Sequence, residues 1–175
     1  MAAREIRVNF EHLYKLASAS RPVKKAICVG SVPPEMDAVW QKLKAAGVTV
    51  ELFERGSDSG KEQGVDQCLQ VHMLRALADA ESPAVAVLLT GDGAGYDNGV
   101  GFHADMARLY KKGWGIEVLS WDISCNKRLK AWAQESGLYV PLENHYDEIT
   151  FRGQTRKSKT VSLKHRGRAA PRPTQ

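Results

Sequence analysis

Hydrophobic side chains recur at helical spacing in several stretches of the chain, and short apolar or alternating runs lie between those stretches. In residues 10–18 the apolar side chains fall on one helical face, and Asn9 is positioned as the N-cap. Residues 84–90, AVAVLLT, form a continuous apolar run, which is typical of a strand covered on both faces. We predict helices over residues 10–18, 33–47, 65–80, 102–113 and 126–137, and strands over residues 24–30, 48–54, 84–90, 114–121 and 138–142, with residues 148–151 as an additional edge.

Helices and strands alternate throughout this series. Such alternation predicts an α/β fold, a three-layer α/β/α sandwich with a mainly parallel sheet and right-handed crossovers. At 175 residues the chain has the size of one domain, and no internal repeat is visible. We therefore predict one domain over residues 1–151, followed by a basic, disordered tail over residues 152–175.

Charge is unevenly distributed between the predicted domain and the tail. Eight of the 25 Lys and Arg residues lie in residues 152–175, which contain no acid, so residues 1–151 carry 17 basic against 20 acidic groups. A basic tail on a slightly acidic body predicts a polyanionic partner such as RNA; the alternative is a disordered, solvated terminus. The predicted RNA-binding residues are Arg152, Arg156, Lys157, Lys159, Lys164, Arg166 and Arg168.

Composition places the chain among soluble globular proteins, with 43% hydrophobic and 26% charged residues. No apolar run approaches the length that spans a bilayer, and Arg4, Glu5 and Arg7 interrupt the start, unlike a secretory signal. The three cysteines are widely spaced without a CxxC pair, which predicts reduced, buried thiols. We expect a cytoplasmic protein without membrane contact.

Acidic residues follow several of the predicted strands. Because ligands of parallel α/β sheets bind at the carboxyl ends of the strands, we expect these residues to lie at one edge of the sheet. Carboxylates held close together repel one another, so such a cluster implies a cation, and oxygen ligands suit Mg²⁺ or Mn²⁺. The candidate ligands and supporting groups are Asp66, Asp92, Asp97, Asp105, Asp122, Ser124 and Asn126.

Residues 90–105, TGDGAGYDNGVGFHAD, contain five glycines and three aspartates. A loop that cradles phosphate uses backbone N–H groups and usually a lysine, whereas the first basic residue here is Arg108. Tyr96 occupies the third glycine position of a GxGxxG fingerprint, and Asp92 would repel a pyrophosphate. The glycines favour a sharp turn that lets Asp92 and a later aspartate face one metal ion. For Asp97 the alternative is a surface turn.

Two histidines are supporting candidates. His72 follows Asp66 by almost two helical turns, and a metal or acid–base role competes with the more common role of a core or rim histidine. His103 stands at the start of a predicted helix beside Asp105, where it is closer to the predicted site. Nothing near the cysteines singles one out as an activated nucleophile.

The segments QGVDQCLQVHML, residues 63–74, and VLLTGDGAGYDNGVGFHADMARLYKKGWGIEVLSW, residues 87–121, resemble the NYN domain family, a branch of the PIN-like metal-dependent ribonucleases. The family's GVD motif matches Gly64 to Asp66, and its SGD motif matches Thr90 to Asp92. The resemblance implies a PIN-like, Rossmannoid fold over residues 9–150 and a Mg²⁺ or Mn²⁺ site. It also implies that a metal-activated water attacks an RNA phosphodiester.

Two features depart from the family pattern. His72 stands at the position of the second aspartate of the helix motif, and the N-terminal strand that carries the DxxN motif is absent from the sequence. We expect either that the domain over residues 1–151 is N-terminally incomplete or that it lacks a first-strand ligand. Losing that carboxylate would weaken both metal binding and water activation. We predict Asp66, Asp92 and Asp105 as catalytic residues, Asp66, Asp92, Asp97 and Asp105 as metal ligands, and Asp122, Asn126, His103 and His72 as supporting residues.

Three functions compete for this chain. The leading hypothesis is a metal-dependent endoribonuclease. The second is a non-catalytic RNA-binding or scaffold module of the same fold. The third is a nucleotide- or sugar-binding protein that uses the loops at Gly30 and Gly91.

Overall fold

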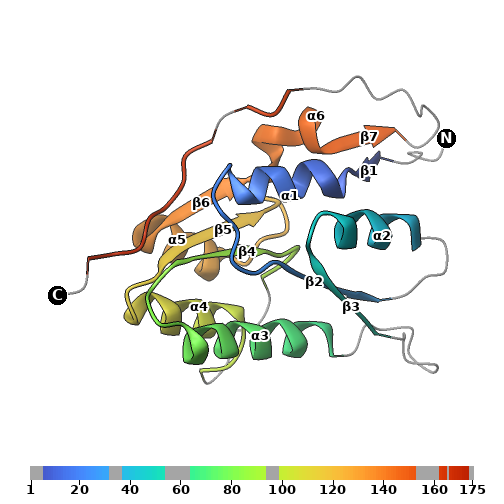
Figure 1. The fold of residues 1–175 in the computed structure, drawn as a ribbon. Coiled ribbons are helices and arrows are strands. Elements are labelled where there is room, and N and C mark those ends of the chain that lie inside the picture. The colour runs from blue at the N-terminus through green and yellow to red at the C-terminus, as the bar shows by residue number, and fades with distance from the viewer. Residues whose placement is uncertain are drawn as a thin grey trace.

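The structure of the chain is a computed structural model that describes residues 6–31, 37–53, 64–93, 99–152, 162–164 and 166–173. The predicted alternation of helices and strands is confirmed (Figure 1). In chain order the elements are β1 (Ile6–Val8), α1 (Phe10–Ser18), β2 (Ile27–Ser31), α2 (Asp37–Ala45), β3 (Thr49–Phe53), α3 (Val65–Asp79), β4 (Val85–Leu89), α4 (Phe102–Lys111), β5 (Gly115–Ser120), α5 (Lys127–Ser136), β6 (Leu138–Pro141), the 3₁₀-helix η2 (Leu142–His145), α6 (Tyr146–Ile149) and β7 (Thr150–Arg152).

The described strands form three ladders. Strands β4, β5 and β6 pair in parallel in that order, and β2 pairs in parallel with β3. The mainly parallel α/β fold that we predicted is therefore confirmed. The predicted extra edge, residues 148–151, is only partly correct, because residues 148 and 149 end α6 and the strand β7 begins at Thr150. Strand β7 pairs antiparallel with β1, a strand that we did not predict.

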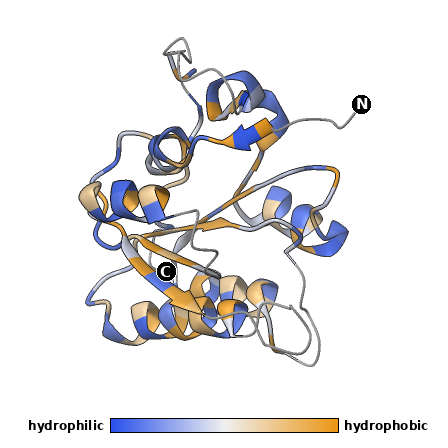
Figure 2. Ribbon diagram, turned by 90° about the vertical axis from the view of Figure 1, so that its right-hand side faces the viewer, coloured by the Kyte–Doolittle hydropathy of each residue, from blue (hydrophilic) through white to orange (hydrophobic). Residues whose placement is uncertain are grey.

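Helices cover both faces of the β4–β6 sheet. On one face, Leu88, Ile116 and Val118 pack with the buried side chains of α4 and α5, and apolar side chains of α3 pack against this cluster. On the other face, Leu119 and Val140 pack with α1 and α6. Helix α2 lies over β2 and β3 in a third cluster. Figure 2 shows orange, apolar strands between helices whose ribbons carry both colours, as expected for a three-layer arrangement.

The end of the chain also packs against the domain. Glu117, in the fully buried strand β5, accepts hydrogen bonds from Arg21, Arg166 and the main-chain N–H of Ala169. Arg166 also donates to two main-chain carbonyls near the end of α1. This packing differs from the disordered tail that we predicted over residues 152–175, because a buried carboxylate requires partners and Arg166 is one of them. Figure 1 shows this segment in red, on the side of the sheet that carries α1 and α6.

Within the described part of the chain, no helix is long and apolar enough to cross a membrane.

Candidate functional site

Hydrogen bonds join the carboxyl ends of β4 and β5. Ser120 donates its hydroxyl to the main-chain oxygen of Thr90 over 2.8 Å, and Ser124 donates to that of Gly91 over 2.5 Å. The main-chain N–H of Asn126 donates to the carbonyl of Asp92 over 2.6 Å. The two strand ends that the sequence placed at one edge are therefore linked directly.

Asp92 is exposed at this edge. The residue after it, Gly93, lies in a turn that requires a glycine. Gly93 has a φ of +59°, and a Cβ placed on it would lie 2.6 Å from Cδ2 of Leu129. Its N–H donates to the hydroxyl of Thr90 over 3.0 Å, which closes the turn. The start of the glycine loop thus holds Asp92 at the exposed rim of the sheet.

The next acids along this edge are Asp122 and Glu143. The carboxylate of Asp122 pairs with Lys130 over 2.7 Å, and the hydrogen bond from Lys130 holds the pKa of Asp122 below its usual value. Glu143, in η2 after β6, accepts the main-chain N–H of Asp122 over 2.7 Å. We missed Glu143, although it is the first acid after a predicted strand. Asn126, a predicted supporting residue, caps α5 by accepting the N–H groups of the first turn.

Asp105 differs from the other predicted ligands because it is buried, in the first turn of α4. Its Oδ1 pairs with Arg108 over 2.6 Å, while its Oδ2 is buried without a hydrogen-bond partner among the described residues. Burial raises the pKa of Asp105, and Arg108 opposes that rise. Arg108 also donates to the carbonyl of Gly99, which ties the end of the glycine loop to α4.

The remaining predicted site residues are dispersed. Asp66 is exposed in the first turn of α3. His103 packs its ring against Trp132, with centroids 4.9 Å apart, and burial lowers the pKa of this histidine. Among the described residues, Asp66, Asp92 and Asp105 do not meet as a three-ligand group that would hold an ion. Asp97 lies outside the described residues.

The predicted RNA-binding residues differ in their exposure to solvent. Arg152, Lys164 and Arg168 are exposed. Arg166 is only 8% exposed and its guanidinium contacts protein groups, so its predicted role in RNA binding is replaced by a role in neutralising Glu117. Arg156, Lys157 and Lys159 lie outside the described part of the chain.

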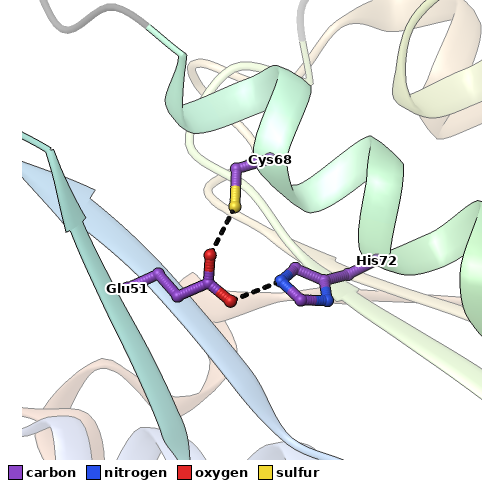
Figure 3. A group of neighbouring side chains, drawn as sticks. All are labelled: Glu51, Cys68 and His72. Atoms are coloured by element: carbon purple, nitrogen blue, oxygen red, sulfur yellow. Dashed lines mark hydrogen bonds and ion pairs between the residues drawn. The ribbon is translucent and has the colours of Figure 1, made fainter.

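A second cluster joins β3 to α3, and we had identified only His72 as a candidate within it. In Figure 3, Glu51 of β3 points toward Cys68 and His72, which stand one helical turn apart on α3. The thiol of Cys68 lies 3.0 Å from Oε2 of Glu51, and Nε2 of His72 lies 2.6 Å from Oε1. The Cys-x₃-His spacing on a predicted helix was a signal in the sequence, but nothing local indicated which strand would face it.

Hydrogen bonding also shapes the ionisation of this cluster. Bonds from Cys68 and then His72 lower the pKa of Glu51, which keeps the carboxylate ionised. Burial, together with the hydrogen bond to Glu51, raises the pKa of the Cys68 thiol to about 11. At neutral pH the group is therefore a carboxylate that accepts a hydrogen bond from a neutral thiol.

Comparison with known families decides the classification. The NYN domain family matches residues 1–136, which is most of the chain. The chain belongs to the NYN domain family. A search of the curated proteins found no match. Membership of the NYN family implies a nuclease-like, RNA-related function, and nucleases of the NYN and PIN-like type generally depend on divalent metals.

The two motifs that resemble those of the NYN family lie at the ends of secondary-structure elements. Asp66 of the GVD motif begins α3, and Asp92 of the SGD-like motif follows β4, so each stands where a helix begins or a parallel strand ends. Strand β1 carries no acid and pairs with β7, so it does not supply the DxxN motif of the NYN family. Exposed carboxylate oxygens are suitable donors for Mg²⁺ or Mn²⁺.

Proposed function

We propose that the chain is a metal-dependent endoribonuclease that hydrolyses RNA phosphodiester bonds. One observation carries this proposal: the acids of both recognised NYN motifs, Asp66 and Asp92, are exposed at the start of α3 and the end of β4. To hold Mg²⁺ or Mn²⁺ together, these acids would have to come closer to one another than they lie in the described structure. Asp105, whose Oδ2 has no hydrogen-bond partner among the described residues, would be a further ligand. A bound ion would lower the pKa of a water molecule and stabilise negative charge on the scissile phosphate.

The surroundings of the two acids support contact with a large substrate. Asp92 lies on an exposed rim held by strand-end hydrogen bonds, so a polymer can approach it from solvent. Lys164 and Arg168 are exposed and would contribute phosphate contacts, together with the basic residues between 152 and 161. Base-specific contacts are not required for this kind of binding.

The test is cleavage of a labelled single-stranded RNA in the presence of Mn²⁺. Cleavage should require the metal, stop on addition of EDTA, and fall at least about a hundredfold in Asp92→Asn, because a charge that holds the metal is lost. Asp79→Asn is the matched control, since Asp79 is an exposed acid at the far end of α3. Cleavage that proceeds unchanged in Asp92→Asn would contradict the assignment.

The second candidate is a non-catalytic RNA-binding module. The favouring observations are that Asp105 pairs with Arg108 and that, in the described residues, Asp66, Asp92 and Asp105 form no three-ligand group. This function predicts RNA binding without cleavage, and binding unaffected by EDTA. Measuring RNA affinity alongside cleavage separates the two candidates.

A further inference from the structure

The Glu51 cluster combines three kinds of metal-ligating atom from two elements. A carboxylate oxygen of Glu51, the sulfur of Cys68 and a ring nitrogen of His72 all lie within 4.8 Å of one another. Cys68 and His72 are four positions apart on a helix, which places them on the same face. Figure 3 shows the three side chains converging between β3 and α3.

The position of Glu51 is unusual for a carboxylate. In β3, Val50 packs against α2, so the alternation of a strand directs Glu51 to the opposite face, which α3 covers. The carboxylate is half-buried there and takes its hydrogen bonds from two side chains of α3. Its hydrogen-bond partners are a thiol, which is a weak donor, and an imidazole.

Only one ring nitrogen of His72 has a hydrogen-bond partner among the described residues. Nε2 of His72 contacts Glu51, whereas Nδ1 is buried and makes no hydrogen bond within the described structure. The ring therefore directs Nε2 toward the carboxylate of Glu51 and the thiol of Cys68. This is the orientation that a metal ligand on α3 requires.

We propose that Glu51, Cys68 and His72 bind a divalent transition-metal ion of the zinc class. The proposal goes beyond the nuclease function, because it uses none of the acids assigned to RNA cleavage. Sulfur and imidazole donors favour Zn²⁺ or Co²⁺, whereas Mg²⁺ and Mn²⁺ favour oxygen donors. The two groups of side chains therefore select different metals.

Binding requires only small movements. Metal–ligand bonds of about 2.0–2.3 Å in a tetrahedral site place ligand atoms roughly 3.5 Å apart, somewhat farther than the present contacts of 3.0 Å and 2.6 Å. The thiol proton leaves to solvent, and the imidazole proton moves from Nε2 to Nδ1, so that sulfur and nitrogen both become donors. The side chain of Glu51 is 38% exposed, so the fourth coordination position faces solvent.

Cobalt substitution tests the site without reference to nuclease activity. Co²⁺ added to the full chain should produce the charge-transfer absorption of a cobalt–thiolate bond, because Cys68 supplies sulfur. The absorption should disappear in Cys68→Ser. In His72→Gln the affinity for Co²⁺ should fall at least tenfold. Added Zn²⁺ should displace Co²⁺, whereas an equal concentration of Mg²⁺ should not.

Two controls make the result decisive. Cys28→Ser removes another half-buried thiol on β2 and should leave the absorption intact. Asp92→Asn removes the proposed nuclease ligand and should also leave it intact, so that failure of either proposal is recognised separately. Absence of the absorption in the unmodified chain, or its persistence in Cys68→Ser, would overturn the proposal.

Discussion

Arg166 donates a hydrogen bond from Nη2 to Oε2 of Glu117 over 2.7 Å, joining the end of the chain to the buried central strand β5. Arg21 makes a second, two-pronged contact with the same carboxylate, at 2.7 Å and 2.9 Å. Two guanidinium groups therefore neutralise one carboxylate whose side chain has no exposure to solvent.

Glu117→Gln should lower the free energy of unfolding by about 3–5 kcal/mol, because it leaves two arginines without their buried counter-charge. Urea denaturation followed by circular dichroism measures this change. Glu11→Gln is the control, since Glu11 pairs with Lys15 at the surface and its loss should cost less than about 0.5 kcal/mol. Equal effects in the two variants would show that the buried pair contributes no more than a surface pair.

Acid should destabilise the fold through the same carboxylate. Burial alone would raise the pKa of Glu117, but hydrogen bonds from Arg21 and Arg166 outweigh burial and lower it from the usual 4.5. A carboxyl group with a lowered folded-state pKa contributes stability that is complete above its unfolded pKa and is lost as pH falls below it. Stability measured in urea should therefore decrease below pH 4.5, and less steeply in Glu117→Gln.

Gly93→Ala should damage the rim that carries Asp92. A left-handed φ costs alanine roughly 1–2 kcal/mol, and the added Cβ would also clash with Leu129. We expect a lower melting temperature and reduced RNA cleavage. Gly91→Ala is the matched control, because a Cβ at Gly91 meets no atom within 4 Å. A melting temperature in Gly93→Ala equal to that of the control would contradict the predicted strain.

The basic residues between 152 and 161 can be tested by substitution rather than by deletion. Replacing Arg156, Lys157 and Lys159 with Gln should weaken RNA binding and reduce the salt dependence of log K by about 2, at about 0.7 per phosphate contact in single strands. Deletion of the whole tail is unsuitable, since it would remove Arg166. A control that replaces the exposed Lys24, Lys25 and Lys44 removes the same charge from elsewhere on the surface. Equal losses in both variants would exclude a specific role for the segment.

Periodicity was sufficient to predict the main elements of the fold. The continuous apolar run became β4, Asn9 caps α1 as expected, and the helices begin and end within a few residues of their predicted bounds. The pairing of β1 with β7 was missed because strands of three residues are too short to show alternation. The two strands also lie near opposite ends of the sequence, so no local pattern joins them.

The candidate sites were less predictable, because they depend on contacts between distant residues. Asp92 could be placed at the rim since it follows the apolar run that forms β4 by three residues. No local pattern indicates that Arg166 reaches Glu117, or that Glu51 faces His72 across 21 residues of chain. The sequence around a charged residue does not show whether that residue forms an ion pair with a distant residue in the fold.

Helix α3 belongs to both proposed sites, because Asp66 lies in its first turn while Cys68 and His72 face β3. None of its described side chains is fully buried. A movement of this helix on binding of a metal ion at Glu51 would also move Asp66, which would couple the two binding equilibria. By reciprocity, the factor by which an ion at Glu51 changes RNA affinity must equal the factor by which RNA changes affinity for that ion.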